Sequence, residues 1–246
     1  MRLVRDIHTH TNYSHGTATV AEMVEAAREK GLTGISITEH GHYHHYARGI
    51  SMEDYREMKG QVEQMRQRYP DMQILFGVEA NVVSMEGDID FTPEEAEIFD
   101  VVNVGFHVLC HMKNLRGYLR IHLPFFLGYK LKWRRFQEIS RRNCTQAMLN
   151  VLERYPIHMI THPMSNYRMD LNAVAEKCAQ TGTLLEINNA RGKLSAREVA
   201  QVLPTGVGFA VGSDAHSTDK VGACARSFAI IEESGVPLDR VENVEA

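Results

Sequence analysis

The sequence lacks paired cysteines, an N-terminal leader and any apolar run long enough to cross a membrane. Its four cysteines lie far apart and form no CxxC pair, and this spacing disfavours a zinc ribbon. The first residues lead directly into an apolar run that is typical of a strand. We therefore expect a cytoplasmic protein with reduced thiols. The cysteines are Cys110, Cys144, Cys178 and Cys224.

The sequence also lacks the glycine-rich motif that follows the first strand in dinucleotide-binding and P-loop proteins. Basic residues are not in excess, since the net charge is −4 and the pI is near 6.4. The surface as a whole is therefore not built to attract nucleic acid. A length of 246 residues and a hydrophobic fraction of 43% fit one large α/β barrel or two small domains.

Short apolar runs alternate with amphipathic stretches along the chain. The first strand is expected to end near residue 10. Six more strands are expected at about 34–38, 73–78, 100–106, 156–161, 183–187 and 207–211. Helices are expected at about 19–30, 51–69, 133–155, 171–181, 195–203 and 219–234, with another starting at 92. Seven such βα units predict a parallel barrel that is closed or nearly closed, with an open doubly wound sheet as the alternative. No linker divides the chain, so we expect 1–246 to be a single domain.

The first strand ends in two histidines, His8 and His10, and His15 follows soon after. Residues two apart on a strand point to the same face, so His8 and His10 project together. Two neutral imidazoles aimed at one point can begin a transition-metal site. An isolated pair of this kind is structural about as often as it binds a metal. The residues at the other strand ends therefore decide between a metal site and structural histidines.

Metal-ligand residue types stand at the ends of six of the seven expected strands. They are His8, His10, His40, Glu79, His107, His162, Asp214 and His216. The carboxyl ends of parallel barrel strands converge on one mouth, and packing gives no reason for this pattern. We therefore predict metal binding. Together with His15 there are nine candidates, which suit three ions with open positions if one carboxylate bridges.

These residues lie in motifs that resemble the PHP (polymerase and histidinol phosphatase) family of metal-dependent phosphoesterases. The motifs are Asp6–Thr11, Ile37–Gly41, Gly77–Glu79, His107, Thr161–Pro163 and Gly212–His216, in the order of the family. Residues 185–189 and 240–244 are most similar to its small bacterial YcdX-type branch. The resemblance implies a distorted (β/α)7 barrel with a trinuclear metal site at the carboxyl ends of its strands.

The resemblance also implies a role for each candidate ligand. One ion would be held by His8, His10, Glu79 and Asp214, a second by His15, His40 and His216, and a third by Glu79, His107 and His162. The implied reaction is hydrolysis of a phosphate ester by a metal-bound hydroxide held by Glu79, Asp214, His8 and His10. The ligand types suit Zn, Mn and Fe alike, so the identity of the three divalent ions stays open.

Other polar residues are expected near the mouth. Asp6 and Glu39 are expected to orient ligating imidazoles, with an exposed or capping carboxylate as the alternative. Arg191, just past the sixth strand, is expected to grip a substrate phosphate, with a solvated loop arginine as the alternative. The histidines of the 42–45 loop lack strand-end placement, and we interpret them as shaping the pocket rather than as ligands. These are His42, His44 and His45.

A basic and aromatic excursion at about 110–135 follows the fourth strand. Residues 110–142 carry nine Lys and Arg against one acid, Glu138, so this segment has a net charge of +8 and the rest of the chain −12. One interpretation is a lid for a phosphate-rich substrate, with nucleic acid bound through residues 113–142. Another is an interface with a partner subunit or an anionic membrane surface. The third is the solvated face of a helix packed on the barrel. We favour this third interpretation for 133–142, and a lid or an interface for 115–132.

The leading hypothesis is therefore a phosphoesterase that acts on a phosphorylated small molecule. A narrower version is a histidinol-phosphate phosphatase, and a broader one is a nuclease that acts on DNA ends. An amidohydrolase is the alternative from another enzyme class, but the late strands supply no lysine for its usual carboxylated ligand. A metal-loaded module without catalysis is the non-enzymatic alternative. The sequence leaves the oligomeric state open, a homo-oligomer included.

Overall fold

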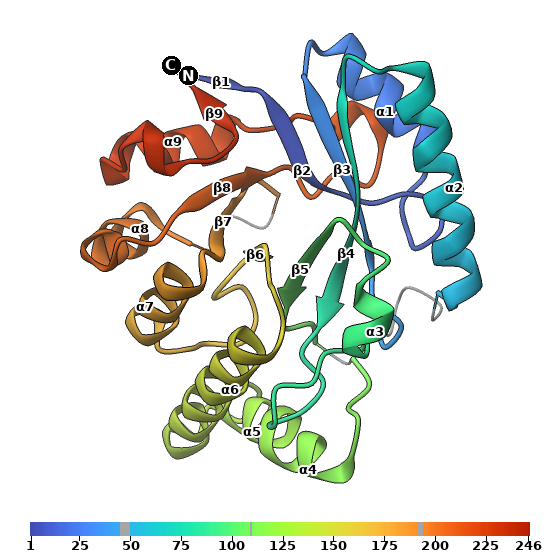
Figure 1. Ribbon diagram of the computed structural model, residues 1–246. Coiled ribbons are helices and arrows are strands. Elements are labelled where there is room, and N and C mark those ends of the chain that lie inside the picture. The colour runs from blue at the N-terminus through green and yellow to red at the C-terminus, as the bar shows by residue number, and fades with distance from the viewer. Residues whose placement is uncertain (45–49, 109, 191–193) are drawn as a thin grey trace.

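The computed structural model describes residues 1–44, 50–108, 110–190 and 194–246. Seven parallel strands form one sheet, in which the spatial order follows the order of the chain (Figure 1). The strands are β2 Arg5–Thr9, β3 Gly34–His40, β4 Gln73–Asn81, β5 Val101–Gly105, β6 Met159–Ile160, β7 Leu184–Asn188 and β8 Phe209–Gly212. The expected seven-stranded parallel arrangement is confirmed.

The two outer strands of the sheet meet and make it a nearly closed barrel. Thr9 at the end of β2 forms a parallel bridge with Ala215, and the His10 amide donates to the Ala215 carbonyl at 2.8 Å. Ile7 and Ala210 pack together with Met159 of β6. Because β6 neighbours neither β2 nor β8, these side chains fill the barrel interior. The barrel prediction is confirmed, and the open doubly wound alternative is wrong.

Nine α-helices are present in the described part of the chain, and most of them surround the barrel (Figure 1). They are α1 Val20–Glu29, α2 Met52–Arg68, α3 Pro93–Ala96, α4 Leu115–Gly117, α5 Leu123–Tyr129, α6 Arg134–Arg154, α7 Leu171–Thr181, α8 Ala196–Val202 and α9 Ala225–Ser234. Capping boxes begin α1, α2, α3 and α8, where a Ser or Thr side chain accepts from the third amide of the helix. The last helix begins later than expected, because Gly222 takes a φ of +72° and separates α9 from the 3-10 turn at 218–220.

The two ends of the chain pair at the start of the barrel. β1, Arg2–Leu3, and β9, Val244–Glu245, form an antiparallel pair. The buried Asn243 side chain accepts from the Val211 amide at 2.9 Å and donates to the carbonyls of Val211 and Arg5 at 2.7 and 2.8 Å. Because Arg5 lies on β2 and Val211 on β8, one side chain ties the first and last barrel strands together.

After β5 the chain leaves the barrel and forms a helical arm, defined here as residues 115–135. A π-helical turn, Tyr118–His122, joins α4 to α5, and α6 follows. The inner side of the arm is buried through Gly117, Ile121, Pro124 and Gly128. A Cβ at Gly128 would lie 2.8 Å from the Gln137 amide nitrogen, so glycine lets α5 pack closely on α6. None of the helices in the described part of the chain has the length and apolarity that crossing a membrane requires.

A buried carboxylate fixes the loop that follows β8. Asp6 of β2 accepts from the Ser213 hydroxyl at 2.6 Å, the Ser213 amide at 3.2 Å and the Gly222 amide at 2.7 Å. Burial raises the pKa of Asp6, while the hydrogen bonds from Ser213 and Gly222 oppose that rise. Asp6 therefore holds the start of the 213–222 loop against the first strand.

We expect Asp6→Asn to lower the free energy of unfolding by about 1–3 kcal/mol, because the asparagine amide group would face buried N–H and O–H donors that need an acceptor. Urea denaturation measures the change. Asp239→Asn is the matched control, since Asp239 is exposed and should tolerate the substitution. Equal stability of the two variants would contradict the assigned role of Asp6.

Candidate metal centre

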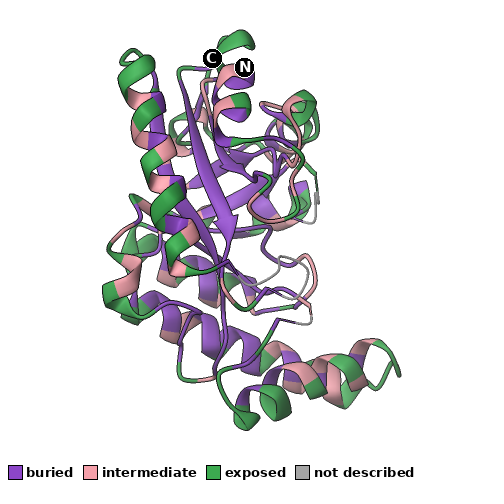
Figure 2. Cartoon of the chain, turned by 90° about the vertical axis from the view of Figure 1, so that its right-hand side faces the viewer, coloured by how far each residue is buried: buried purple, intermediate pink, exposed green. Residues whose placement is uncertain are grey.

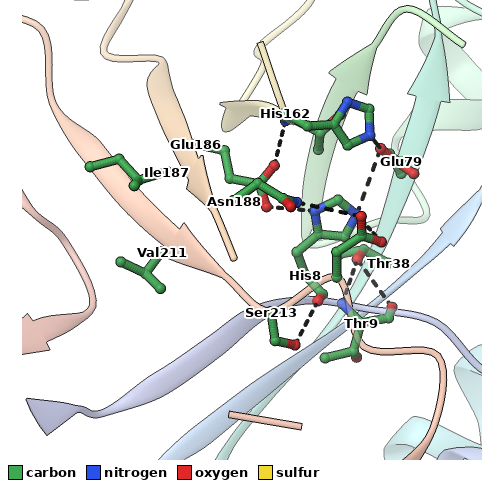
Figure 3. A network of polar contacts seen from close by, with 12 residues as sticks. His8, Thr9, Thr38, Glu79, His162, Glu186, Ile187, Asn188, Val211 and Ser213 are labelled. Atoms are coloured by element: carbon green, nitrogen blue, oxygen red, sulfur yellow. Dashed lines mark hydrogen bonds and ion pairs between the residues drawn. The ribbon is translucent and has the colours of Figure 1, made fainter. Parts of the chain in front are cut away.

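One buried carboxylate, Glu79 of β4, lies at the centre of the converging strand ends. Its Oε1 lies 2.8 Å from His162 Nε2 and 3.2 Å from His107 Nε2, and its Oε2 lies 2.9 Å from His40 Nδ1. His8 Nε2 lies 3.6 Å from Oε1, and Figure 3 shows His8 and His162 turned toward Glu79. Imidazoles from four other strand ends thus surround a single carboxyl group.

Among the described residues, ligand-type atoms gather here in four groups, in each of which they lie within 4.8 Å of one another. The groups are His8, His10 and Asp214; His10, His40 and His216; Glu79, His107 and His162; and His40, His44 and His107. The ring centroid of His15 lies 4.2 Å from that of His216 and 4.9 Å from that of His40. The structure therefore brings all nine of the sequence-predicted ligand residues to one place.

Polar partners fix the orientation of the imidazoles. Nδ1 of His8 lies 2.7 Å from Glu186 Oε1, and Nδ1 of His107 lies 2.7 Å from Asn81 Oδ1. An acceptor at Nδ1 favours the tautomer with its proton there, so the lone pair of Nε2 faces the centre. Such partners are typical of metal-ligating histidines, because they set both the ring orientation and the basicity.

The electrostatics of the site follow from burial and from the close approach of unlike groups. Burial would by itself raise the pKa of Glu79, but the surrounding imidazoles, first His107 and then His8, hold it well below its ordinary value. Burial lowers the pKa of His10 to about 3. His10 is therefore neutral and Glu79 ionised near pH 7, as metal ligation requires. Burial would lower the pKa of His8, but Glu186, Glu79 and Asp214 raise it well above its ordinary value, so His8 would lose a proton when it binds a metal.

Several buried atoms here have no hydrogen-bond partner within the described part of the chain. They include both carboxylate oxygens of Glu79, both ring nitrogens of His40 and Nε2 of His107, His162 and His216, although imidazole nitrogens lie within ion-pair distance of Glu79. Leaving such groups unsatisfied costs about 1–3 kcal/mol each, so they call for a ligand of their own. Neutral imidazole nitrogens and carboxylate oxygens that converge in this way fit divalent transition metals.

The backbone bends unusually at two of these residues. His162 and Asp214 take φ values of +29° and +54°, in a region that side chains other than glycine rarely adopt. Conformations of this kind cost about 1–3 kcal/mol each and cluster at functional sites. Gly212 allows a close approach instead, because a Cβ there would overlap with Glu186 Oε1 beside His8.

The residues predicted to support the ligands or the substrate differ in their contacts with the site. Glu39 is buried and accepts from the Thr11 amide, and its Oε2 lies 3.9 Å from His10 Nδ1, beyond hydrogen-bond distance. The hydrogen bonds of Asp6 go to Ser213, Gly222 and a backbone amide rather than to an imidazole nitrogen. Arg191 falls outside the described residues.

Sequence reasoning gave no site role to Glu186 and Asn81, and it placed His44 outside the ligand set. The ring of His44 stacks on that of His40 at 3.8 Å between centroids and shares a ligand-type group with His107. Glu186 also accepts from the His162 amide, so it contacts two of the predicted ligands. The sequence signal for Glu186 was its position on β7. It lies two residues before Asn188, the last residue of that strand, and therefore on the same face.

Comparisons with known proteins agree with this arrangement. The family model described as PHP domain matches residues 6–190. A "Probable phosphatase" of Shewanella loihica is 28% identical over 99% of this chain and 90% of its own length. "Probable phosphatase YcdX" of Escherichia coli K12 is 27% identical over 97% of this chain and 89% of its own length.

A crystal structure also shares the fold. It is histidinol phosphate phosphatase from Lactococcus lactis, complexed with Zn, L-histidinol and phosphate. The TM-score is 0.65 with 16% sequence identity, and the match covers 96% of this chain and 95% of that one.

We expect Glu186→Gln to weaken metal binding by about 10- to 100-fold, because a glutamine amide supports the His8 ring less strongly than a carboxylate. Competition with a chromogenic chelator measures the affinity. Glu176→Gln, an exposed change on α7, is the matched control and should bind metal like the unaltered protein. Unchanged affinity in Glu186→Gln would contradict the orienting role of this carboxylate.

Proposed function

The chain belongs to the PHP domain family, and from this premise we propose that it hydrolyses phosphate esters at a centre of three divalent metal ions. The observation that carries the proposal is the position of Glu79, whose two oxygens face imidazoles from several strand ends. A carboxylate so placed can bridge ions, and the neighbouring histidines complete their coordination.

Three sets of side chains would hold the ions. The first set is His8, His10, Glu79 and Asp214, the second is His15, His40 and His216, and the third is Glu79, His107 and His162. We add His44 as a further ligand candidate, because its ring lies against His40 and His107. Divalent ions, when bound, lower the pKa of a water that attacks phosphorus and neutralise the phosphate oxygens.

The protein itself supplies orientation and a dry environment. His8 and His107 are held by Glu186 and Asn81, so their Nε2 atoms need little reorganisation to bind. The side chains of His8 and Glu79 are fully buried, which strengthens electrostatic interactions inside the site. No side-chain nucleophile is needed for direct attack by water.

A phosphorylated small molecule is the substrate class that we favour. Two full-length relatives carry phosphatase names, and the structurally similar Lactococcus lactis protein is described with L-histidinol and phosphate. A histidinol phosphate-like monoester is therefore the first compound to test. A nuclease activity has weaker support, since the chain as a whole is acidic.

The proposal is tested by loading the purified protein with Zn or Mn, counting bound ions, and screening phosphomonoesters, phosphodiesters and single-stranded DNA. We expect three ions per chain and phosphate release from monoesters. Fewer than two ions per chain, together with no phosphate release from any ester, would refute the proposal.

We expect His8→Ala to slow phosphate release by about 10³-fold, because loss of a ligand removes several kcal/mol of transition-state stabilisation. Steady-state kinetics on the best ester measure the effect, and circular dichroism checks that the fold is retained. His158→Ala is the matched control, since this half-buried histidine directly precedes β6 at the opposite end of the barrel. A rate for His8→Ala close to that of His158→Ala would show that the site lies elsewhere.

A further inference from the structure

Exposed apolar side chains gather on the helical arm, residues 115–135. Six of them expose between 43% and 71% of their surface: Leu115, Leu119, Leu123, Phe126, Leu131 and Trp133. Outside the arm, only Met1 and Tyr43 are large apolar side chains with comparable exposure among the described residues. A concentration of this kind on one short segment marks an interaction surface rather than ordinary scatter.

The same segment is rich in cations that lack acidic partners. Residues 113–137 contain no Asp or Glu. Arg116 pairs with Glu86 at 2.6 Å. Within the described part of the chain, no ion pair engages the remaining basic residues of the arm, which are Arg120, Lys130, Lys132, Arg134 and Arg135. The arm therefore presents positive charge and apolar surface together.

The exposed face is a fixed feature of the fold. Ile121 and Pro124 on the inner side are buried, the Asn143 side chain donates to the Arg120 carbonyl at 2.7 Å, and Gln137 donates to the Gly128 carbonyl at 3.0 Å. These contacts bind the arm to α6. Figure 2 shows the result, in which helices with exposed residues project from the lower end of the molecule.

We propose that the arm docks the protein on an anionic lipid bilayer. Leu115, Leu119, Leu123 and Phe126 recur at helical spacing, and Leu131 and Trp133 follow in the turn before α6. Exposed side chains of these types suit the boundary between headgroups and acyl chains. Lysines and arginines beside them suit anionic headgroups, each contributing a favourable interaction at such a surface. Trp133 and Tyr118 belong to the residue types that concentrate at membrane interfaces.

Charge and side-chain chemistry favour a bilayer over two other partners. A symmetric contact between two copies of the arm would bring the unpaired cations of both copies together, and like charges repel. Nucleic acid would satisfy the cations, but Leu115, Leu119 and Leu123 offer no ring to stack on bases and would stay exposed. An anionic bilayer satisfies both properties at once.

A cavity at the root of the arm strengthens the choice of a lipid. It measures about 480 Å³ and is lined by Phe125, Phe126 and Lys130 of the arm and by Val108 and Tyr167 of the loops after β5 and β6. Aromatic lining residues together with the exposed Lys130 suit an acyl segment or another apolar group next to an anion. Val108 directly follows His107, so a docked arm would hold the metal centre close to the membrane.

The test is flotation of the full-length protein with vesicles of phosphatidylcholine alone or with phosphatidylglycerol. We expect binding to the anionic vesicles only, and release at high salt. Arg134→Gln/Arg135→Gln should weaken partitioning by about 25-fold, since each cation contributes roughly a factor of five. Leu119→Ser/Phe126→Ser should weaken it by at least about tenfold.

The matched control is Arg56→Gln/Arg197→Gln, which removes two exposed cations from α2 and α8. This variant should bind vesicles like the unaltered protein, and all variants should release phosphate from a soluble ester at the same rate. Absence of vesicle binding would overturn the proposal, as would equal loss of binding in the control. A dimer or a DNA complex that the arm variants disrupt, without vesicle binding, would assign the arm to that partner instead.

Discussion

The burial of Glu79 is the constraint on which the rest of this structure depends. A carboxylate with no exposed surface is costly unless positive charge or hydrogen bonds compensate it. Here both of its oxygens lack hydrogen bonds within the described residues, and imidazoles approach it from the ends of other strands. Divalent ions would supply the missing charge and coordinate the imidazoles at the same time. The interior of the barrel is thus arranged for a group with two or more positive charges.

The contacts that close the barrel also hold parts of the candidate metal centre in place. Asp6 of β2 holds the loop that carries Asp214, and the Thr9–Ala215 bridge joins the same two segments. Glu186 of β7 contacts both His8 of the first strand and the backbone of His162. Since the predicted ligands come from distant parts of the chain and must be in place together, metal binding should favour the folded state.

The charged groups of the helical arm are exposed and separate, whereas those of the barrel interior are buried and in contact. Inside the barrel, unlike groups lie in contact and are shielded from water, so their interaction is strong and local. On the arm, cations stand apart in solvent beside exposed leucines, so their effect is weak for each residue and depends on salt. The first arrangement suits tight coordination of ions, and the second suits reversible attachment to an extended surface.

The sequence by itself determined the barrel and the list of predicted ligands, because both depend on local patterns. Alternating apolar runs and capping signals placed the strands and helices, and the HxH and Asp214-x-His216 spacings placed ligands at strand ends. Only the tertiary structure decided that Glu79 lies centrally and that Glu186 and Asn81 orient His8 and His107. The tertiary structure also shows that the ring of His44 stacks on that of His40. These contacts join residues 26 to 178 positions apart or depend on a loop path, and no local periodicity encodes such distances.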